Sequence, residues 1–300
     1  MNKNRNEAYI LLLLLTLIWG SSFILMKKGM LAYSPSQVAS MRVFFAGLVF
    51  VPFIIKNFSQ IPWNKFKYII LFGLLEIGIP PYLYTFAETK VDSSSAGILN
   101  SLVPLFTLLT GIFMFKHKFH WLTQVGVLIG LVGAFLMTFF KDISINETSF
   151  DFSNSYGLLI ILATLMYGFA GNILNEYLND VPSSLLSATA FVSLSIPAGI
   201  YLFSTNFITI PLSNHQHLSA FLYVVILAVF GSSLAIFLFS KLTQKSNALF
   251  ASFVTYLIPF ISLIWGAIDG ETISIVHFLS LLIIFVGIYL ANLGENFKKT

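Results

Sequence analysis

Long apolar stretches alternate with short polar ones along the whole chain of 300 residues. A bilayer core is about 30 Å thick, so a helix of about 20 apolar residues can cross it. Ten windows of roughly that length predict ten transmembrane helices. The expected spans are 8–26, 36–55, 68–87, 94–115, 122–140, 156–178, 185–204, 217–240, 247–268 and 274–293. This pattern predicts an all-α integral membrane protein.

The boundary between the seventh and eighth spans falls in a region without charge. Residues 181–240 contain no Asp, Glu, Lys or Arg, and as one helix they would be about 90 Å long at about 1.5 Å per residue. That length is about three times the thickness of the membrane core. The polar residues 204–206 and 213–217 lie on either side of Pro211, and they predict a turn between two spans.

Composition narrows the class of protein. Hydrophobic residues make up 57% and charged residues 9% of the chain, with a mean hydropathy of +0.88, whereas soluble proteins carry about 25% charged residues. A soluble enzyme, a disordered chain and a nucleic-acid-binding protein are therefore excluded. The absence of Cys excludes disulfides, thiol catalysis and Cys-based metal sites. The apolar run 8–26 is too long for a signal peptide, so we expect a retained first span.

The distribution of Lys and Arg predicts the orientation in the membrane, because cytoplasmic loops carry an excess of these residues. With the N-terminus inside, eleven of the sixteen lie in cytoplasmic segments, four lie in external segments, and Arg42 lies within a span. The cytoplasmic set is Lys3, Arg5, Lys56, Lys65, Lys67, Lys116, Lys118, Lys241, Lys245, Lys298 and Lys299, and the external set is Lys27, Lys28, Lys90 and Lys141. We expect a multi-pass protein of the cell (inner) membrane with both termini in the cytoplasm.

The two halves of the chain resemble each other. Residues 16–20 (TLIWG) in the first span correspond to residues 164–168 (TLMYG) in the sixth. Residues 102–106 (LVPLF) in the fourth span correspond to residues 257–261 (LIPFI) in the ninth. Because the matches occur in the same order, they predict two repeats of five helices. The predicted units are a first repeat at 1–140, an external linker at 141–155 and a second repeat at 156–300.

Five is an odd number, so the two repeats must enter the membrane from opposite sides. Inverted repeats of this kind are typical of secondary transporters, whose substrate site lies between the repeats near the midplane. Pro104 and Pro259 occupy corresponding positions in the two repeats. Paired helix interruptions of this kind indicate such a site, and two packing kinks are an equally good explanation.

Three segments carry a resemblance to a known family. They are residues 19–23 (WGSSF), similar to its first-helix motif, residues 42–46 (RVFFA), similar to its second-helix pattern, and residues 248–271, similar to the motif that closes each repeat. Over residues 9–293 the chain resembles a ten-span member of the EamA-like branch of the drug/metabolite transporter (DMT) superfamily. The resemblance implies export or exchange of amino acids, related metabolites or drugs. The first repeat departs from the pattern, because Lys116-His117 stands where the family often has Gly-Glu.

Glu76 lies near the middle of the third span, where an ionisable side chain costs about 2.5–3.5 kcal/mol on insertion scales. Such a side chain usually faces a hydrated cavity or a charged partner. Pro80 and Pro81 follow it, and because prolines lack N–H groups they leave carbonyl oxygens free near Glu76. We expect Glu76 to bind the ammonium group of a substrate or to carry a coupling proton. The alternative is a structural pair with Arg42.

Arg42 must also lie within a span, because residues 43–55 alone supply only about 20 Å of helix. Its guanidinium can hold a carboxylate through two parallel hydrogen bonds. It can also extend outward to the lipid headgroups. The family resemblance favours a structural or topological role over ligand contact, since the family pattern often has Arg at this position.

Uncharged polar and aromatic residues at membrane depth form a second group of candidates for the lining of a cavity. Amide and hydroxyl groups near the helix breaks can bind a substrate, and aromatic rings can supply apolar walls with a hydrogen-bonding edge. The candidates are Asn100, Tyr256, Tyr167, Asn172, Trp19, Tyr82, Tyr84 and Trp265. Hydrogen bonding between helices explains any one of them adequately as well.

The chain contains no motif for catalysis or for a bound cofactor. Its five His residues form no His-Glu-x-x-His motif, and there is no Gly-x-Ser-x-Gly motif and no phosphate-binding Gly-rich loop. We therefore expect no enzyme activity, no cofactor and no metal.

The function predicted from these observations is secondary or facilitative transport by alternating access through a central cavity, exporting or exchanging amino acids or related small metabolites. The expected partners are a small-molecule substrate, membrane lipid and, in one hypothesis, a coupling proton, but no nucleic acid. The main alternative is a carrier of drugs or lipid-linked substrates with the same fold. An intramembrane enzyme is a distant alternative.

Overall fold

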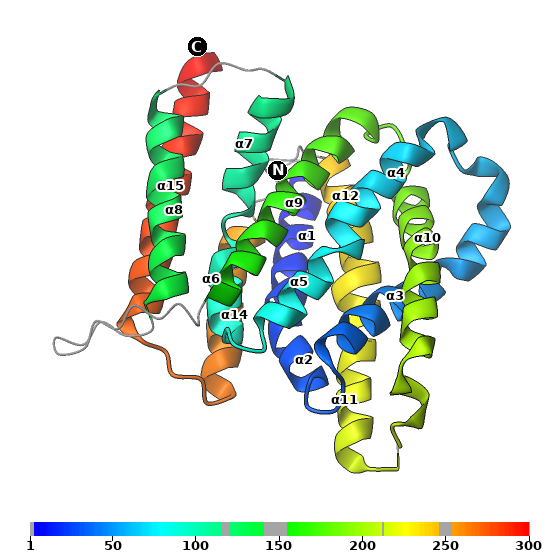
Figure 1. Ribbon diagram of the computed structural model, residues 1–300. Helices are drawn as coiled ribbons and strands as arrows, with labels where there is room; N and C mark the ends of the chain where they lie inside the picture. The colour runs from blue at the N-terminus through cyan, green and yellow to red at the C-terminus, as the bar shows by residue number, and fades with distance from the viewer. Residues whose placement is uncertain (1–2, 116–120, 141–154, 212, 246–253, 300) are drawn as a thin grey trace.

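The computed structural model describes residues 3–115, 121–140, 155–211, 213–245 and 254–299, and every regular element in these ranges is helical (Figure 1). The first half contains α1 (Lys3–Gly20), α2 (Ser22–Gly29), α3 (Pro35–Asn57), α4 (Phe66–Gly73), α5 (Pro80–Ala87), α6 (Ser93–Asn100), α7 (Val103–Phe115) and α8 (Trp121–Phe139). The second half contains α9 (Gly157–Tyr177), α10 (Ser183–Ser204), α11 (His215–Ile226), α12 (Ala235–Lys245), α14 (Val254–Ile268) and α15 (Ile275–Lys299). Two π-helical segments, η3 (Leu74–Gly78) and η6 (Leu227–Leu234), and the short 3-10 helices η1 (Phe58–Gln60), η2 (Trp63–Lys65) and η5 (Asn206–Thr209) connect them.

Ten helical stretches of the described chain are apolar enough to lie in a membrane. Seven have the length of a full span: Ile10–Gly29, Pro35–Gln60, Trp63–Ala87, Ser93–Ile112, Gly157–Tyr177, Ser183–Ser204 and His215–Thr243. Three are shorter: Trp121–Met137, Val254–Ile268 and Ile275–Ala291. They coincide with the ten predicted spans, so the prediction of an all-α membrane protein is confirmed. Residues 247–253 of the ninth predicted span, residues 141–154 of the predicted linker and the Lys116-His117 pair lie outside the described residues.

The two sets of five spans are inverted relative to each other. Helix α1, which opens the first set, runs away from the N-terminus toward the lower edge of Figure 1, whereas α9, which opens the second set, runs in the opposite direction. This arrangement follows from the odd number of spans in each set. The limits given above for the repeats and the linker stay a prediction.

A π-helical segment interrupts the third span of each set, η3 in the first and η6 in the second. At the end of η3, the N–H of Ile79 donates to the carbonyl oxygen of Leu74 over 3.0 Å. The wider turn ends where Pro80 and Pro81 begin α5, because neither proline can donate to the helix. Wide turns of this type occur frequently at functional sites, and both lie beside the cavity described below.

The last helices of the two sets, α8 and α15, pack along each other at one side of the molecule (Figure 1). Glycine permits their close approach, because a Cβ atom on Gly287 of α15 would collide with backbone atoms of Gly126 and Gly130 of α8. The pair forms a support beside the other eight spans, which surround the site.

Candidate functional site

A cavity of about 990 Å³, counting space that is open to solvent, lies between the two sets of spans. The first set contributes Trp19, Ser22, Phe23, Met26, Arg42, Val43, Glu76, Ile77, Pro81, Tyr84, Asn100, Val103 and Thr107. The second set contributes Tyr167, Gly171, Phe191, Ser232, Ile236, Phe239, Thr243, Thr255 and Ile258. No lining residue comes from the described parts of α8 and α15. The cavity therefore occupies the place that inverted repeats predict for a substrate site.

Arg42 reaches the cavity from the N-terminal part of α3, a helix that begins at Pro35. Its Nε donates to the Ser232 hydroxyl oxygen in η6 over 2.7 Å, and its Nη1 approaches the Met26 sulfur at 3.6 Å. A guanidinium has five N–H donors, so most of them stay available to a ligand. The side chain is thus held by the opposite set of spans while it faces the cavity.

Glu76 reaches the same cavity from η3, and its side chain is only partly buried. It forms no ion pair with Arg42 in the described chain, so the predicted alternative of a structural pair is not found. Glu76 lies within the π-helical turn, whose residues Glu76 and Ile77 both line the cavity. A carboxylate and a guanidinium thus line one space without neutralising each other.

Four further predicted residues line the cavity together with these charges. The Tyr84 hydroxyl donates to Asn100 Oδ1 over 2.6 Å, and the Tyr84 and Tyr167 rings stack with centroids 6.1 Å apart. Trp19 Nε1 donates to the Gly231 carbonyl oxygen over 3.1 Å. Its ring lies 5.2 Å from that of Phe239, measured between centroids. Aromatic rings therefore line the cavity beside Arg42 and Glu76, and the polar edges of Tyr84 and Trp19 are hydrogen-bonded.

Several predicted residues do not line the cavity, and neighbouring helices satisfy them instead. The Asn172 amide donates to Thr107 O, to Thr110 Oγ1 and to Gly168 O at 2.8–3.0 Å. The Tyr82 hydroxyl bonds to the Ser40 hydroxyl at 2.8 Å, and Trp265 Nε1 donates to Ser21 Oγ at 2.9 Å. For these side chains the structure shows hydrogen bonds to nearby groups, and hydrogen bonding between helices was the alternative to lining the cavity.

The remaining predicted residues support the helices around the cavity. The Tyr256 ring packs against Phe285, with centroids 6.1 Å apart. Pro104 lies in the first turn of α7, and Pro259 lies inside α14. Pro80 is buried at the start of α5, beside Pro81, which does line the cavity.

Sequence reasoning missed several lining residues. Ser232 is the most informative, because it fixes Arg42 and lies in the π-helical segment of the second set. The pair Ser232-Ser233 in an otherwise apolar span was the available signal. Thr107 and Thr255 gave no signal, because a hydroxyl at membrane depth usually bonds to its own helix.

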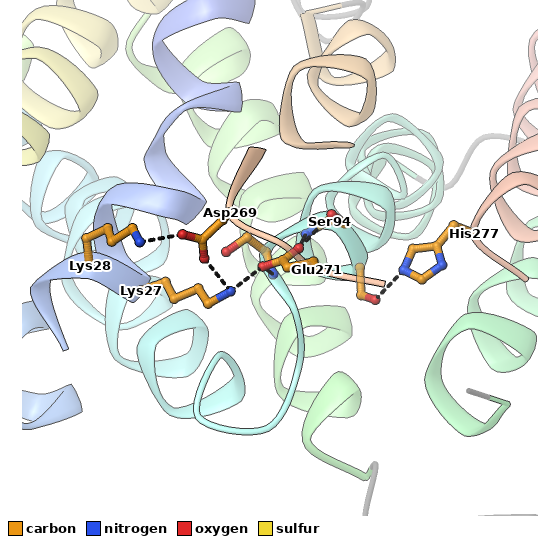
Figure 2. Close-up of polar contacts among 8 residues, drawn as sticks. Lys27, Lys28, Ser94, Asp269, Glu271 and His277 are labelled. Atoms are coloured by element: carbon orange, nitrogen blue, oxygen red, sulfur yellow. Dashed lines mark hydrogen bonds and ion pairs between the residues drawn. The ribbon is translucent and has the colours of Figure 1, made fainter. Parts of the chain in front are cut away.

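Charged residues gather where α2 and α14 terminate (Figure 2). Lys27 Nζ lies 2.7 Å from a carboxylate oxygen of Asp269 and 2.7 Å from one of Glu271, and Lys28 pairs with Asp269. Glu271 also accepts from the Ser94 hydroxyl at 2.7 Å and from the backbone N–H groups of Ser93 and Ser94 at 3.1 Å. These six residues, here named the Lys27 cluster, tie α2, the start of α6 and the segment after α14 together.

The Lys27 cluster keeps its acids ionised. Burial disfavours the charge on Glu271, but its bonds to Lys27 and Ser94 outweigh burial and hold the pKa of Glu271 below the usual value. Burial likewise opposes ionisation of Asp269, yet Lys27 and Lys28 hold its pKa below the usual value. The sequence identified Lys27 and Lys28 only as external charges and residues 248–271 only as a family-like motif, and it did not indicate that they meet.

Ten apolar helices in two inverted sets, with a central cavity that carries opposite charges, are typical of a membrane transporter. The chain belongs to the EamA-like transporter family, which matches residues 6–139 and again residues 154–293. It is 28% identical over 288 residues to "Uncharacterized inner membrane transporter YedA" of Escherichia coli (strain K12), covering 94% of this chain and 89% of that protein. The chain is accordingly a multi-pass membrane transporter.

Two further relatives have lower sequence identity. "Uncharacterized transporter" of Archaeoglobus fulgidus is 25% identical, with 87% of this chain and 90% of that protein covered. "Protein PagO" of Salmonella typhimurium is 24% identical, with 97% of this chain and 94% of that protein covered. A solved structure titled "Crystal structure of protein" matches with a TM-score of 0.63 at 17% identity, over 97% of this chain and 99% of that chain. That likeness concerns the fold alone.

Proposed function

We propose that the protein exports or exchanges amino acids or related zwitterionic metabolites by alternating access through the central cavity. The observation that carries this proposal is the presence of Arg42 and Glu76 in one cavity without an ion pair between them. Two unpaired opposite charges in a low-dielectric space are costly unless a ligand compensates both. A molecule with a carboxylate and an ammonium group supplies that compensation.

Each end of such a ligand has a suitable partner. The Arg42 guanidinium, fixed through Nε by Ser232, keeps its remaining N–H groups for a carboxylate. The Glu76 carboxylate accepts from the ammonium. The rings of Trp19, Tyr84 and Tyr167 offer apolar surface to the ligand's side chain.

The conformation supports access from the cytoplasm. The cavity extends to Thr243 and Thr255, which lie at the ends of α12 and α14 remote from Asp269. The Lys27 cluster ties the other end together. The excess of Lys and Arg in the segments next to Thr243 supports a cytoplasmic location for that end of the cavity and for both termini. In this proposal the substrate enters there and leaves when the Lys27 cluster separates.

One observation favours a second candidate, a carrier of apolar cationic drugs or lipid-linked molecules. Most lining side chains are apolar, among them Phe23, Phe191 and Phe239. A cation without a carboxylate could use Glu76 and these rings alone. The two candidates differ in what Arg42 contributes, because a drug cation gains nothing from a guanidinium.

Transport by inside-out membrane vesicles tests the proposal. Vesicles with and without the protein are offered a panel of labelled amino acids, amines, carboxylic acids and lipophilic cations, with and without a pH gradient. We expect protein-dependent uptake of zwitterions, with amines and acids competing only weakly. Uptake confined to lipophilic cations, or competition by lipids but not by amino acids, would replace this proposal with the second candidate.

A further inference from the structure

Glu88 is a buried carboxyl group without a hydrogen-bond partner in the described chain. It follows directly after α5, one residue beyond the third span. Its side chain is 8% exposed, and neither carboxylate oxygen is in contact with a donor. An ionised carboxylate in such a place loses its hydration without compensation, and such a group becomes neutral by taking up a proton.

Charged groups on several elements influence Glu88. Lys27 of α2 and Glu271 of the segment after α14 act on it from the Lys27 cluster, while Arg42 of α3 acts on it from the cavity. Tyr84 of α5, the helix that ends just before Glu88, also interacts with it electrostatically. Glu88 therefore lies in the field of both the cavity and the Lys27 cluster, and bonds to neither.

Glu271 and Glu88 differ in their hydrogen-bond donors, and this difference determines which of the two acids holds a proton. Glu271 accepts from Lys27, from the Ser94 hydroxyl and from two backbone N–H groups, so its charge is compensated. Glu88 has none of these donors. When two acids influence each other and only one is compensated, the other one holds the proton. Consistently, burial and the Glu271 carboxylate raise the pKa of Glu88 well above its usual range, against the opposite effect of Arg42 and Lys27.

We propose that Glu88 is a proton-binding site of the transport cycle, and that the Lys27 cluster assembles only after Glu88 has taken up one proton from the external solution. When the cluster is apart, water reaches the Glu88 carboxylate, which is then ionised at neutral pH. Binding of one proton gives the neutral acid, which can be buried beside Glu271. Release of that proton on the cavity side completes a proton-for-substrate exchange. This inference rests on the alternating access proposed above and assigns the proton to Glu88, while Glu76 serves the substrate.

The sign of the pH dependence follows from the two states. The assembled state has the higher Glu88 pKa, so it binds more protons than the open state at intermediate pH. Assembly is therefore favoured as external pH falls, and it weakens as pH rises through the higher pKa. The ratio of the two states changes by up to about tenfold per pH unit for one proton.

An introduced cysteine can report the opening, because the natural chain contains no Cys. Ser22 lines the cavity and is 4% exposed, so Ser22→Cys reacts with an impermeant maleimide in the external solution only when the Lys27 cluster is apart. The thiol itself reacts faster at higher pH. Ser213→Cys, at an exposed position of the segment before α11, corrects for that effect at each pH.

In right-side-out vesicles, the corrected labelling of Ser22→Cys should rise several-fold as external pH increases from about 5.5 to about 8, the interval above the usual carboxyl range. Adding Glu88→Gln, which cannot ionise, should make labelling low at every pH. Adding Glu88→Asp, which keeps an acid, should preserve the rise. A rise that persists in Glu88→Gln, or flat labelling in the Ser22→Cys protein itself, would overturn the proposal.

The experiment needs no substrate, so it separates this proposal from the proposed function. If labelling of the Ser22→Cys protein does not depend on pH while zwitterion transport is normal, the role of Glu88 is rejected and the proposed function stands. Normal labelling behaviour without zwitterion transport rejects the substrate assignment alone. If Glu88→Gln fails to reach the membrane, the Glu88→Asp profile still decides, because the smaller acid should shift the midpoint of the rise, whereas an unchanged midpoint contradicts the role of Glu88.

Discussion

Arg42 Nε donates to the Ser232 hydroxyl oxygen over 2.7 Å, joining α3 of the first set of spans to the π-helical segment of the second. This bond crosses the boundary between the inverted halves inside the cavity itself. It orients the guanidinium before any ligand arrives, which lowers the entropy lost on binding. Ser232 is therefore a positioning residue that acts through Arg42.

Removing that acceptor should weaken substrate binding without unfolding the protein. Ser232→Ala leaves the Arg42 Nε without its partner, and we expect about tenfold weaker binding of zwitterions, or about 1.4 kcal/mol. Ser219→Ala on the exposed part of α11 is the matched control. Equilibrium binding to purified protein measures the substrate affinity of both variants. Equal affinities would show that Ser232 does not position Arg42 for the substrate.

Arg42→Lys should alter substrate ranking as well as affinity. A lysine keeps the charge but lacks the planar pair of donors that holds a carboxylate. We expect zwitterions to bind at least about tenfold more weakly, while the corresponding amines without a carboxylate keep their affinity. The conservative exchange Lys56→Arg at an exposed position provides the control. An unchanged ranking of acids and amines would leave Arg42 with the structural role that the family resemblance favours.

Glu271→Gln should loosen the Lys27 cluster. The change removes the charge that accepts from Lys27 and Ser94, and charge-assisted bonds of this kind contribute about 1.5–3 kcal/mol. We expect a lower midpoint of thermal unfolding and more external labelling at Ser22→Cys. Asp180→Asn, which breaks the exposed pair with Lys65, should change neither property measurably.

The Lys27 cluster should also make the thermal stability of the protein depend on pH in the acid range. Because the pKa of Glu271 is lowered in the folded protein, its stabilising contribution is present above the unfolded value of about 4.3 and is lost as pH falls through the folded value. The thermal midpoint of the natural protein should therefore fall more steeply in acid than that of Glu271→Gln. Parallel curves would show that the bonds of Glu271 contribute nothing to folding.

The contact between α8 and α15 should matter for stability but not for the substrate. Gly287→Ala places a Cβ against backbone atoms of α8, and such overpacking costs about 1–3 kcal/mol. Gly171→Ala adds the same atom where the nearest neighbour is Thr107 Cγ2 at 3.9 Å. We expect only Gly287→Ala to lower the thermal midpoint, with zwitterion affinity retained. A large loss of affinity in Gly287→Ala would show that α8 and α15 do take part in the site.

The spans could be predicted because lipid imposes one simple demand, a helix of about 20 apolar residues with its backbone satisfied internally. Charged residues within spans could also be identified as candidates, because an ionisable side chain in the membrane is energetically costly and usually functional. Arg42 and Glu76 both line the cavity. The direction of an uncharged polar side chain could not be predicted. One residue turns a helix by about 100°, so Asn100 lines the cavity while Asn172 bonds to α7.

Contacts between distant parts of the chain were also beyond prediction. Lys27 and Glu271 lie 244 positions apart, and each alone resembles an ordinary charge at the end of a span. Their meeting depends on how the two inverted halves dock. Glu88 gave no signal for the same reason, because the charged groups that act on it, Lys27, Arg42 and Glu271, are remote in sequence.

The central claim is that Glu76 and Arg42 bind the two ends of one zwitterion, and the binding of charge-deleted ligands to Glu76→Gln tests it most directly. The natural protein, Glu76→Gln and the matched exposed variant Glu176→Gln are titrated with an amino acid that the transport panel identifies, and with its analogue that lacks the ammonium group. We expect Glu76→Gln to bind the amino acid at least about tenfold more weakly and to lose its preference for it over the analogue, whereas Glu176→Gln should behave like the natural protein. Undiminished affinity and preference in Glu76→Gln would contradict the account.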